Sequence, residues 1–260
     1  MKKLFIVFSI LAAIAITIGI ILVIIGGTFG FGNTNYSDEV FHSEQPVSNL
    51  ELYVSAGSAK VELYDGDNVQ IDFQTHSKYG FTVSEKDGTI KLEQHHKGWF
   101  LGWGIAMRTA PSATVKIPKG VALNLSVEIG AGAVTVEGGT FGNVECKVSA
   151  GELTLGNIEC AKASCRVSAG ALKVSSLKCG SLSCKVSAGS QNIGNVTCDN
   201  IDIAVSAGSL NMHVLGNKSD YSISVDKSAG SCNVTTQTGT DANKKIDIDI
   251  SAGSVNVHFN

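Results

Sequence analysis

The tripeptide Ser-Ala-Gly occurs seven times in this chain of 260 residues, and four consecutive copies are spaced by one constant interval. The copies at Ser149, Ser168, Ser187 and Ser206 follow one another in steps of 19 residues, and a degenerate Gly-Ala-Gly at 130–132 stands one step earlier. A fixed period of this length is typical of a stacked repeat, in which each repeat is one rung and neighbouring rungs bury each other's apolar faces. The period therefore predicts a β-solenoid if the rungs are made of strands.

Strands are indicated by the alternation of apolar and polar residues on both sides of each triplet. In one repeat Cys165 and Val167 flank Arg166, and after the triplet the alternation resumes with Leu172 and Val174. Period-two alternation indicates half-buried β-strands. Because Gly-Asn pairs at 156–157 and 194–195 give a second turn signal, we expect two or three short strands in each rung.

The triplets themselves are expected to form tight corners. Small residues fit a crowded bend, and glycine can adopt the positive φ that such bends often need. The glycines assigned to these corners are Gly57, Gly151, Gly170, Gly189, Gly208, Gly230 and Gly253.

Stacking gives meaning to columns of equivalent residues, which lie about 4.8 Å apart from rung to rung. One outward column contains Lys147, Arg166 and Lys185 in three successive rungs. Like charges at this spacing repel, so the column is unfavourable unless it is screened or used. It is interpreted either as a groove for an anionic envelope polymer, a lipid headgroup or a partner, or as a solvated edge that prevents aggregation.

Other columns are polar toward the C-terminus. Counted in chain order, His213 and His258 lie two rungs apart with Thr235 between them, which argues against a shared metal site. Asp226 and Asp249 share an outward column and are interpreted as solubilising positions. The fifth residues after the triplet serines form a column whose four successive asparagines predict an amide ladder. The column contains Thr154, Lys173, Asn192, Asn211, Asn233 and Asn256.

Six of the seven cysteines fall into two columns with the same 19-residue step: Cys146, Cys165 and Cys184 in one, and Cys160, Cys179 and Cys198 in the other. Neighbours in a column have Cα atoms close enough for a disulfide, which an exported location would permit. The first column continues with Ile203, however, so cysteine there stands in for an ordinary core residue. This favours core thiols over disulfides. None of the cysteines has the short spacing of zinc ligands, so no metal site is predicted.

The N-terminus carries a different signal. Residues 4–25 form an uncharged apolar run after Lys2 and Lys3, long enough to span a bilayer as a helix. The preceding positive charge predicts a cytoplasmic N-terminus at residues 1–3 and an extracytoplasmic remainder. We expect a signal anchor followed by a flexible tether at 26–40, although cleavage as a signal peptide is the alternative.

The rest of the chain divides into irregular β rungs with a cap at 41–128 and regular solenoid repeats at 129–260. The irregular part contains Trp99, Phe100 and Trp103. This Trp-rich segment is interpreted either as a loop that touches the membrane surface or a partner, or as a cap over the open end of the stack. Strands are expected at Leu50–Val54, Lys60–Tyr64, Val69–Thr75, Phe81–Ser84, Thr89–Glu93, Ala113–Ile117 and Leu123–Ile129.

The run Ala113-Thr-Val-Lys-Ile-Pro-Lys-Gly-Val-Ala-Leu-Asn-Leu125, placed before the regular rungs, resembles a family of bacterial β-strand repeats known as toast-rack domains. The resemblance covers about residues 45–260. It implies a β-helix of short strands, often anchored in the membrane and, in some members, found beside envelope-stress systems. The family bears the label adhesin but is of unknown function, and the resemblance implies no catalytic residue.

The sequence therefore predicts an all-β, single β-solenoid protein with one preceding transmembrane helix and a non-catalytic role in the cell envelope, in interaction or in stress sensing. A surface adhesin that binds glycan or host matter is the alternative, and a polysaccharide-acting β-helix enzyme is the third possibility. No cofactor is expected, and a net charge of −3 gives no case for nucleic acid. Expected partners are the bilayer, through residues 4–25, and an envelope membrane protein or anionic wall polymer. A second copy is also expected, because the last triplet is followed by only a few residues and its rung would be uncapped.

Overall fold

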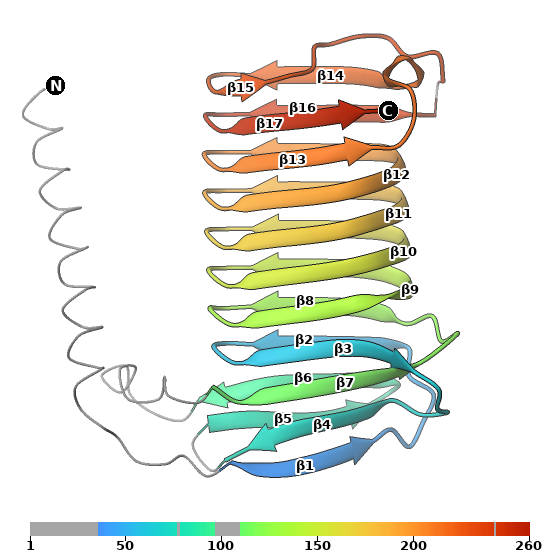
Figure 1. Cartoon of the computed structure of the whole chain (residues 1–260), viewed down its shortest axis with the longest axis vertical. Helices are drawn as coiled ribbons and strands as arrows, with labels where there is room; N and C mark the ends of the chain where they lie inside the picture. Colours follow the sequence, from blue (N-terminus) through green and yellow to red (C-terminus); the bar gives the residue numbers. More distant parts are fainter. Residues whose placement is uncertain (1–35, 77–78, 97–109, 242) are drawn as a thin grey trace, which may run out of the picture.

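The computed structural model describes residues 36–76, 79–96, 110–241 and 243–260, and these residues wind into one stack of rungs that forms a single 17-stranded sheet (Figure 1). The first eight strands are β1 (Ser37–His42), β2 (Asn49–Val54), β3 (Ser58–Tyr64), β4 (Gln70–Thr75), β5 (Tyr79–Lys86), β6 (Thr89–His96), β7 (Ser112–Pro118) and β8 (Asn124–Ile129). The others are β9 (Ala133–Val148), β10 (Glu152–Val167), β11 (Ala171–Val186), β12 (Ser190–Val205), β13 (Ser209–Val214), β14 (Ser222–Lys227), β15 (Ser231–Cys232), β16 (Lys245–Ile250) and β17 (Ser254–Phe259). A 3₁₀ turn, η2 (Lys218–Asp220), precedes β14.

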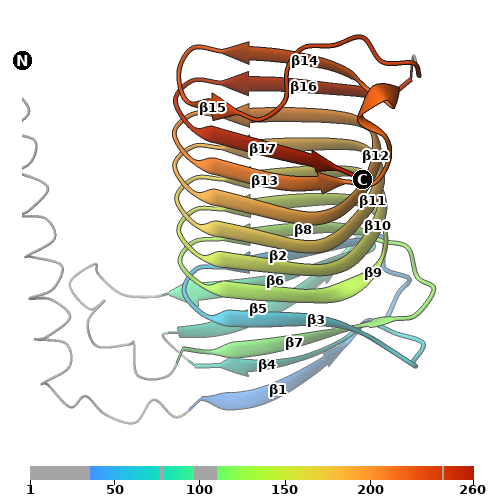
Figure 2. The ribbon, with the colours of Figure 1, turned by 45° about the horizontal axis from the view of Figure 1, so that its top comes forward.

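Each regular rung is built on one long strand of 16 residues, and these strands are β9 to β12. The expectation of two or three short strands in each rung is therefore wrong. Each is parallel to the next in a register of 19 residues, so that Leu153 lies beside Leu172 and Val167 beside Val186. The glycines of the second turn signal, such as Gly156, lie inside a curved strand, although Gly156 itself has no partner in the register of β10 with β9 and β11. The curvature folds the sheet into two layers that enclose the core (Figure 2).

The Ser-Ala-Gly triplets form the corners as predicted, but their glycines are required for a different reason. The backbone of one corner lies directly against the next, and Ala169 donates to the carbonyl of Ser149 at 2.7 Å. A Cβ atom added to Gly170 would lie 2.2 Å from the carbonyl oxygen of Gly151. Among the corner glycines only Gly230 has a positive φ, of 83°. Close approach of neighbouring rungs, more than backbone freedom, therefore excludes a side chain here.

At the N-terminal end of the stack, the rung of β2 and β3 lies directly against the rungs of β8 and β9. Ala131 donates to the carbonyl of Ser55 at 2.6 Å, although the two residues are far apart in sequence. The long gap between these two corners therefore does not insert irregular rungs between them. Instead β4 to β7 extend the stack beyond β2 and β3, and β1 pairs antiparallel with β4 at the end. All seven strands expected before residue 130 are present.

At the C-terminal end, the order of rungs in space differs from the order in sequence. Ser251 donates to the carbonyl of Val205 at 2.9 Å, whereas Ser228 donates to Ile250. Strand β16 therefore lies between β12 and β14, and β17 lies between β13 and β15 (Figure 1). The final triplet of the chain thus belongs to the penultimate rung, and the prediction that it forms an uncapped terminal rung is wrong.

The interior between the two layers is apolar over the whole described stack. Of the described side chains that are buried, only those of Ser43 and Gln191 are polar. No helix in the part of the chain that the structure covers is long and apolar enough to cross a bilayer. The segments predicted as transmembrane helix and as most of the tether lie outside the described residues.

Candidate functional site

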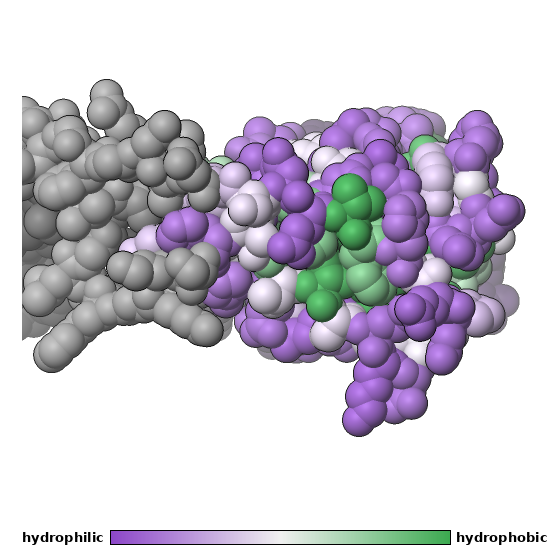
Figure 3. All heavy atoms as spheres, turned by 90° about the horizontal axis from the view of Figure 1, so that it is seen from below, coloured by the Kyte–Doolittle hydropathy of each residue, from purple (hydrophilic) through white to green (hydrophobic). Residues whose placement is uncertain are grey.

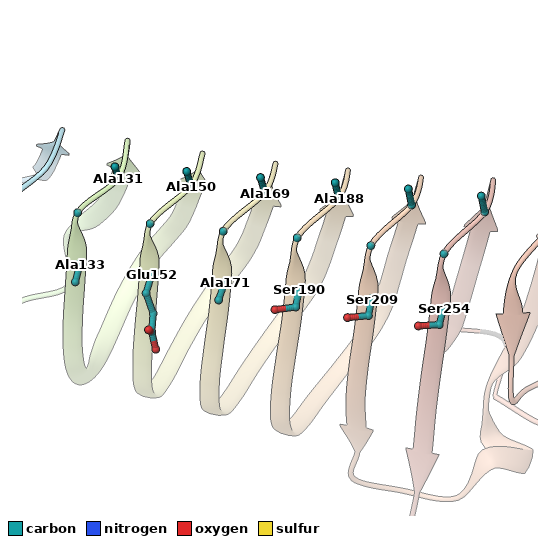
Figure 4. Close-up of a pocket in the computed structure, with 18 of the residues that line it drawn as sticks. Ala131, Ala133, Ala150, Glu152, Ala169, Ala171, Ala188, Ser190, Ser209 and Ser254 are labelled. Atoms are coloured by element: carbon teal, nitrogen blue, oxygen red, sulfur yellow. The ribbon is translucent and has the colours of Figure 1, made fainter. Parts of the chain in front are cut away.

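A groove runs along the row of corners. It has a volume of about 1380 Å³ and is lined almost entirely by alanine, glycine and serine. Figure 4 shows why: Ala131, Ala150, Ala169 and Ala188 project from successive corners in one line. A second line of side chains lies at the start of the strands that follow the corners. It contains Ala133, Glu152, Ala171, Ser190, Ser209 and Ser254. The groove therefore repeats at the spacing of the rungs and exposes backbone, methyl and hydroxyl groups.

Catalytic chemistry in this groove would need a base or an acid beside the serine hydroxyls. The one charged side chain among the residues that line it is Glu152. Its carboxylate forms an ion pair with Lys173 of the next rung, at 2.6 Å. The described groove thus has the composition of a binding or packing surface and lacks the paired groups of a hydrolase.

The structure contains the basic column that the sequence predicted. Lys147, Arg166 and Lys185 are neighbours in the register of β9, β10 and β11. Its charge is partly neutralised, because Glu145 lies 3.2 Å from both the Lys147 ammonium and the Arg166 guanidinium. Among the described residues, none forms an ion pair with Lys185. The column is therefore a moderately basic strip, of which the Lys185 end is the part best placed to meet an anion.

The same face becomes acidic toward the C-terminal end. Asp226 lies beside Asp249, as the sequence predicted, and both side chains are exposed. Because β16 follows β12 in space, Asp247 also lies beside Asp202. The face therefore carries positive charge over the middle rungs and negative charge over the last ones.

The inverted order of the last rungs also changes the histidine column. His213 and His258 are direct neighbours in the register of β13 and β17, so the prediction that Thr235 separates them is wrong. The His213 Nδ1 atom lies 3.2 Å from Asn195 Oδ1. Within the described residues no group of three or more potential metal ligands forms around this pair.

The asparagine column forms a ladder only in part. Asn256 donates to Asn211 Oδ1 at 2.9 Å, again because β17 follows β13. Asn233 leaves the column: its side chain donates to the carbonyl of Val257 at 3.0 Å and accepts from the Val257 N–H at 2.8 Å. Its amide thus takes the place of a further strand and covers the outer edge of β17.

At the N-terminal end of the stack, apolar side chains are not covered by any further strand of the described residues. Phe41 on β1 pairs with buried Ile71, and Val83 on β5 pairs with buried Leu92, so the register points both toward the core. Both are nevertheless only half-buried, because no described strand lies beyond them. Figure 3 shows the result, a group of apolar side chains at this end with polar residues around it.

The predicted contact residues Trp99, Phe100 and Trp103 lie outside the described residues. The described chain leaves β6 at His96 and resumes at Ala110, shortly before β7. Both strands belong to the N-terminal end of the stack, so the Trp-rich segment is connected to the end that carries the apolar patch.

The geometry of stacked corners and curved parallel rungs can be compared with known proteins. The model of the Toastrack DUF4097 family matches residues 47–260. The chain belongs to this family. The toast-rack region therefore includes both the irregular strands and the regular rungs. A comparison with curated proteins finds no match.

Several solved structures resemble this toast-rack chain at low sequence identity. A putative adhesin from Bacteroides fragilis is 14% identical, with 88% of this chain and 100% of that chain covered and a TM-score of 0.53. A putative lipid binding protein from Parabacteroides distasonis is 12% identical, with 89% and 99% covered and a TM-score of 0.48. At these identities the first resemblance shows a common fold alone.

The toast-rack core contains the two cysteine columns that the sequence predicted, and all seven cysteines are free thiols. We call Cys146, Cys165 and Cys184 the inner thiol column, and Cys160, Cys179 and Cys198 the outer thiol column; both follow the strand register. The inner column is completely buried, and this burial raises the pKa of the Cys184 thiol well above its usual value. In the outer column the Cys179 thiol lies 3.3 Å from the Cys198 sulfur.

Three polar side chains with structural roles in the toast-rack fold were not foreseen. Gln94 Oε1 accepts from the N–H groups of Ala56 and Gly57, both at 2.8 Å, and so completes the corner ladder at the N-terminal end. At the C-terminal end the Asn233 side chain forms hydrogen bonds with the backbone of Val257 and so covers the edge of β17. Gln191 is fully buried, and its amide nitrogen donates to the carbonyl of Cys165 at 3.1 Å. Only Gln191 gave a sequence signal, as a polar residue in an apolar column.

Proposed function

We propose that this chain is a non-catalytic, membrane-anchored module of the cell envelope that holds its toast-rack stack outside the cytoplasmic membrane. The apolar run at 4–25 would form the anchor, with the N-terminus in the cytoplasm. The stack would then present a rigid, extended face to an envelope membrane protein or an anionic wall polymer. Its role would be interaction or stress sensing.

The observation that carries this proposal is the position of the apolar end. Strand β1 begins at Ser37, and residues 26–35 would reach at most roughly 35 Å from the end of the apolar run when fully extended. The end that contains Phe41 and Val83 would therefore stay near the bilayer. An apolar surface held close to lipid headgroups has a favourable place to bury itself. The opposite end of the stack would point away from the membrane.

Topology tests the first part of this proposal. Intact spheroplasts that express the full chain are treated with protease, and the chain is followed with antibodies against its C-terminal rungs. We expect digestion from outside and retention of the protein in the membrane fraction after alkaline carbonate extraction. Protection from protease, or release by carbonate, would contradict the proposal.

Partner binding tests the second part. We expect the triple change Lys147→Gln, Arg166→Gln and Lys185→Gln to weaken binding to an anionic polymer such as poly(glycerol phosphate), and added salt to weaken the wild type. The matched control replaces Lys162, Lys173 and Lys178, which lie elsewhere on β10 and β11, by glutamine. Crosslinking in cells, followed by identification of captured proteins, shows whether a membrane protein takes the place of the polymer. Equal binding by both triple variants would exclude the basic strip.

A surface adhesin that binds glycan is the second candidate, favoured by the shared fold with the protein from Bacteroides fragilis that is described as a putative adhesin. Glycan-array binding that is insensitive to salt and to the basic strip would favour adhesion over the proposed role. An enzyme has the least support, because the carboxylate of Glu152 in the groove is paired with Lys173.

A further inference from the structure

The outer thiol column differs from the inner one in ways that bear on its chemistry. In the inner column the register places Val127 beside Cys146 and Ile203 beside Cys184, so these cysteines occupy positions that ordinary apolar residues fill in adjacent rungs. The outer column, like the inner one, contains cysteine in three successive rungs, and its neighbour in the same register is Phe141, beside Cys160. Its other end is closed by Tyr221, whose hydroxyl donates to the carbonyl of Cys198 at 2.9 Å.

Access also separates the two columns. Cys160 and Cys179 are 7% and 8% exposed and Cys198 is 2% exposed, whereas the inner thiols are between 0% and 1% exposed. A small solute can therefore reach the edge of the outer column, while the inner column is sealed by the packing of the core.

The geometry of the outer column suits a disulfide. Adjacent in-register strands place their Cα atoms about 4.8 Å apart, inside the range from which a disulfide closes. The Cys179 thiol already donates to the Cys198 sulfur at 3.3 Å. On its other side Cys179 lies beside Cys160 in the register of β10 and β11. Cys179 is thus the shared neighbour of two thiols, and only one of them can pair with it at a time.

We propose that the outer thiol column is an oxidation site at which Cys179 closes a disulfide with Cys198, while Cys160 remains as a third thiol that can exchange into the pair. The oxidant is a small two-electron oxidant of the hydrogen peroxide class. The hydrogen bond from Cys179 lowers the pKa of the Cys198 thiol, so Cys198 is the nucleophile of the pair. The Cys198 sulfur attacks the O–O bond, which breaks to give a sulfenic acid on Cys198 and one water. The Cys179 sulfur then attacks the Cys198 sulfur, the S–O bond breaks, and the hydroxyl leaves with the Cys179 proton as a second water.

Exchange through the third thiol needs no further oxidant. The Cys160 thiolate attacks the Cys179 sulfur of the disulfide, the new S–S bond forms, and Cys198 leaves as a thiolate that takes up the proton lost by Cys160. Either disulfide would link two adjacent rungs across the ladder. The oxidised column would therefore tie the middle of the stack together without a change in the register of β10, β11 and β12.

Peptide mapping of the full-length wild-type protein tests the proposal. The reduced chain is exposed to hydrogen peroxide, the oxidant is removed with catalase, and remaining thiols are alkylated in denaturant before trypsin digestion. We expect two of the seven thiols to escape alkylation. Peptide 179–185 should be joined to peptide 186–218, with a minor product joined to peptide 148–162.

Fragmentation inside peptide 179–185 decides which cysteine is involved, because this peptide contains both Cys179 and Cys184. A crosslink through Cys179 supports the proposal. A crosslink through Cys184 or between Cys146 and Cys165, or the recovery of all seven alkylated thiols, would overturn it. The same readout on protein oxidised in urea serves as the reference for unfolded chains.

Two variants sharpen the result. In Cys198→Ala we expect the whole crosslink to move to peptide 148–162, because Cys160 is the remaining neighbour of Cys179. Cys146→Val is the control in the inner column, where the neighbouring rung already has valine at the same position, Val127. In this variant we expect the wild-type crosslink in unchanged yield. Loss of the Cys179 crosslink in Cys146→Val, with the circular dichroism spectrum unchanged, would contradict the assignment to the outer column.

Discussion

Ser251 donates its N–H to the carbonyl of Val205 at 2.9 Å, so the last triplet of the chain stacks on the triplet at Ser206 and not on the one at Ser228. The rung of β16 and β17 is therefore inserted between two rungs that precede it in sequence. This makes the C-terminal residues an internal part of the stack, and the earlier strands β14 and β15 depend on them for their ladder partners. The rung that was expected to be uncapped, the one that follows Ser251, therefore lies inside the stack, while self-association itself stays a prediction.

Removal of residues 245–260 is expected to unfold more than one rung. Strands β14 and β15 would lose the strands that pair with them, and β12 and β13 would become edges. Hydrogen exchange should show loss of amide protection over residues 222–232 as well as a fall in melting temperature. Deletion of Asn260 alone, which follows β17, is the control. Preserved protection at 222–232 in the truncated chain would contradict the inserted order.

The corners should tolerate no side chain on the column of glycines. A Cβ atom at Gly189 would lie 2.3 Å from the carbonyl oxygen of Gly170 and 2.6 Å from a methyl group of Val167. We expect Gly189→Ala to lower the free energy of unfolding by about 1–3 kcal/mol, because the adjacent rungs must move apart. Gly180→Ala, inside the preceding strand β11, is the matched control, since the nearest atom to its added Cβ is 3.2 Å away. Equal urea midpoints for the two variants would refute the close-approach argument.

The alternation and the 19-residue period predicted the regular rungs because both depend on local sequence. They could not predict the order of the last rungs, since the triplets at Ser228 and Ser251 are identical and either could stack on Ser206. One residue does distinguish them. At the inward position before the triplet the chain has Ile250 in one case and Lys227 in the other, and Lys227 is exposed. A charged residue in an inward column is tolerated where no rung follows, which marks the rung of Ser228 as the end.

The candidate sites, like the fold, could be predicted from the sequence only in part. The basic column followed from the period, because three consecutive regular rungs fix the neighbours of Arg166. Its neutralisation by Glu145 was not evident, because it depends on how the side chains lie across two rungs. Gln94 and Asn233 were missed for the reason that their partners are brought to them only by the tertiary fold. An isolated amide side chain in the sequence does not show which backbone edge it will meet.

Asn233 should be necessary for the stability of the C-terminal end. Asn233→Ala removes the two hydrogen bonds to the backbone of Val257 and leaves that edge uncovered. We expect a loss of about 1–2 kcal/mol in the free energy of unfolding by urea, and a smaller loss in Asn233→Asp, which keeps the acceptor but not the donor. Asn192→Ala, in the same column of an interior rung, is the comparison. If Asn192→Ala lowers the free energy of unfolding by as much as Asn233→Ala does, the edge role proposed for Asn233 is wrong.

Tyr221 gives a prediction about alkaline pH. Its ring is 1% exposed, and burial raises the pKa of the Tyr221 hydroxyl to about 12. The neutral phenol is therefore favoured in the folded state, so this group stabilises the fold fully below pH 10 and loses its contribution as the pH rises from about 10 to about 12. By linkage the contribution is on the order of 2–3 kcal/mol.

Ultraviolet titration of tyrosinate checks this directly. The difference between the wild type and Tyr221→Phe isolates one of the five tyrosines. We expect this difference to remain near zero at pH 10 and to appear near pH 12, together with loss of the folded circular dichroism signal, because ionisation removes the proton that Tyr221 donates to Cys198. A tyrosinate signal from Tyr221 with a midpoint near pH 10 in protein that is still folded would show that the end of the outer thiol column is open to water.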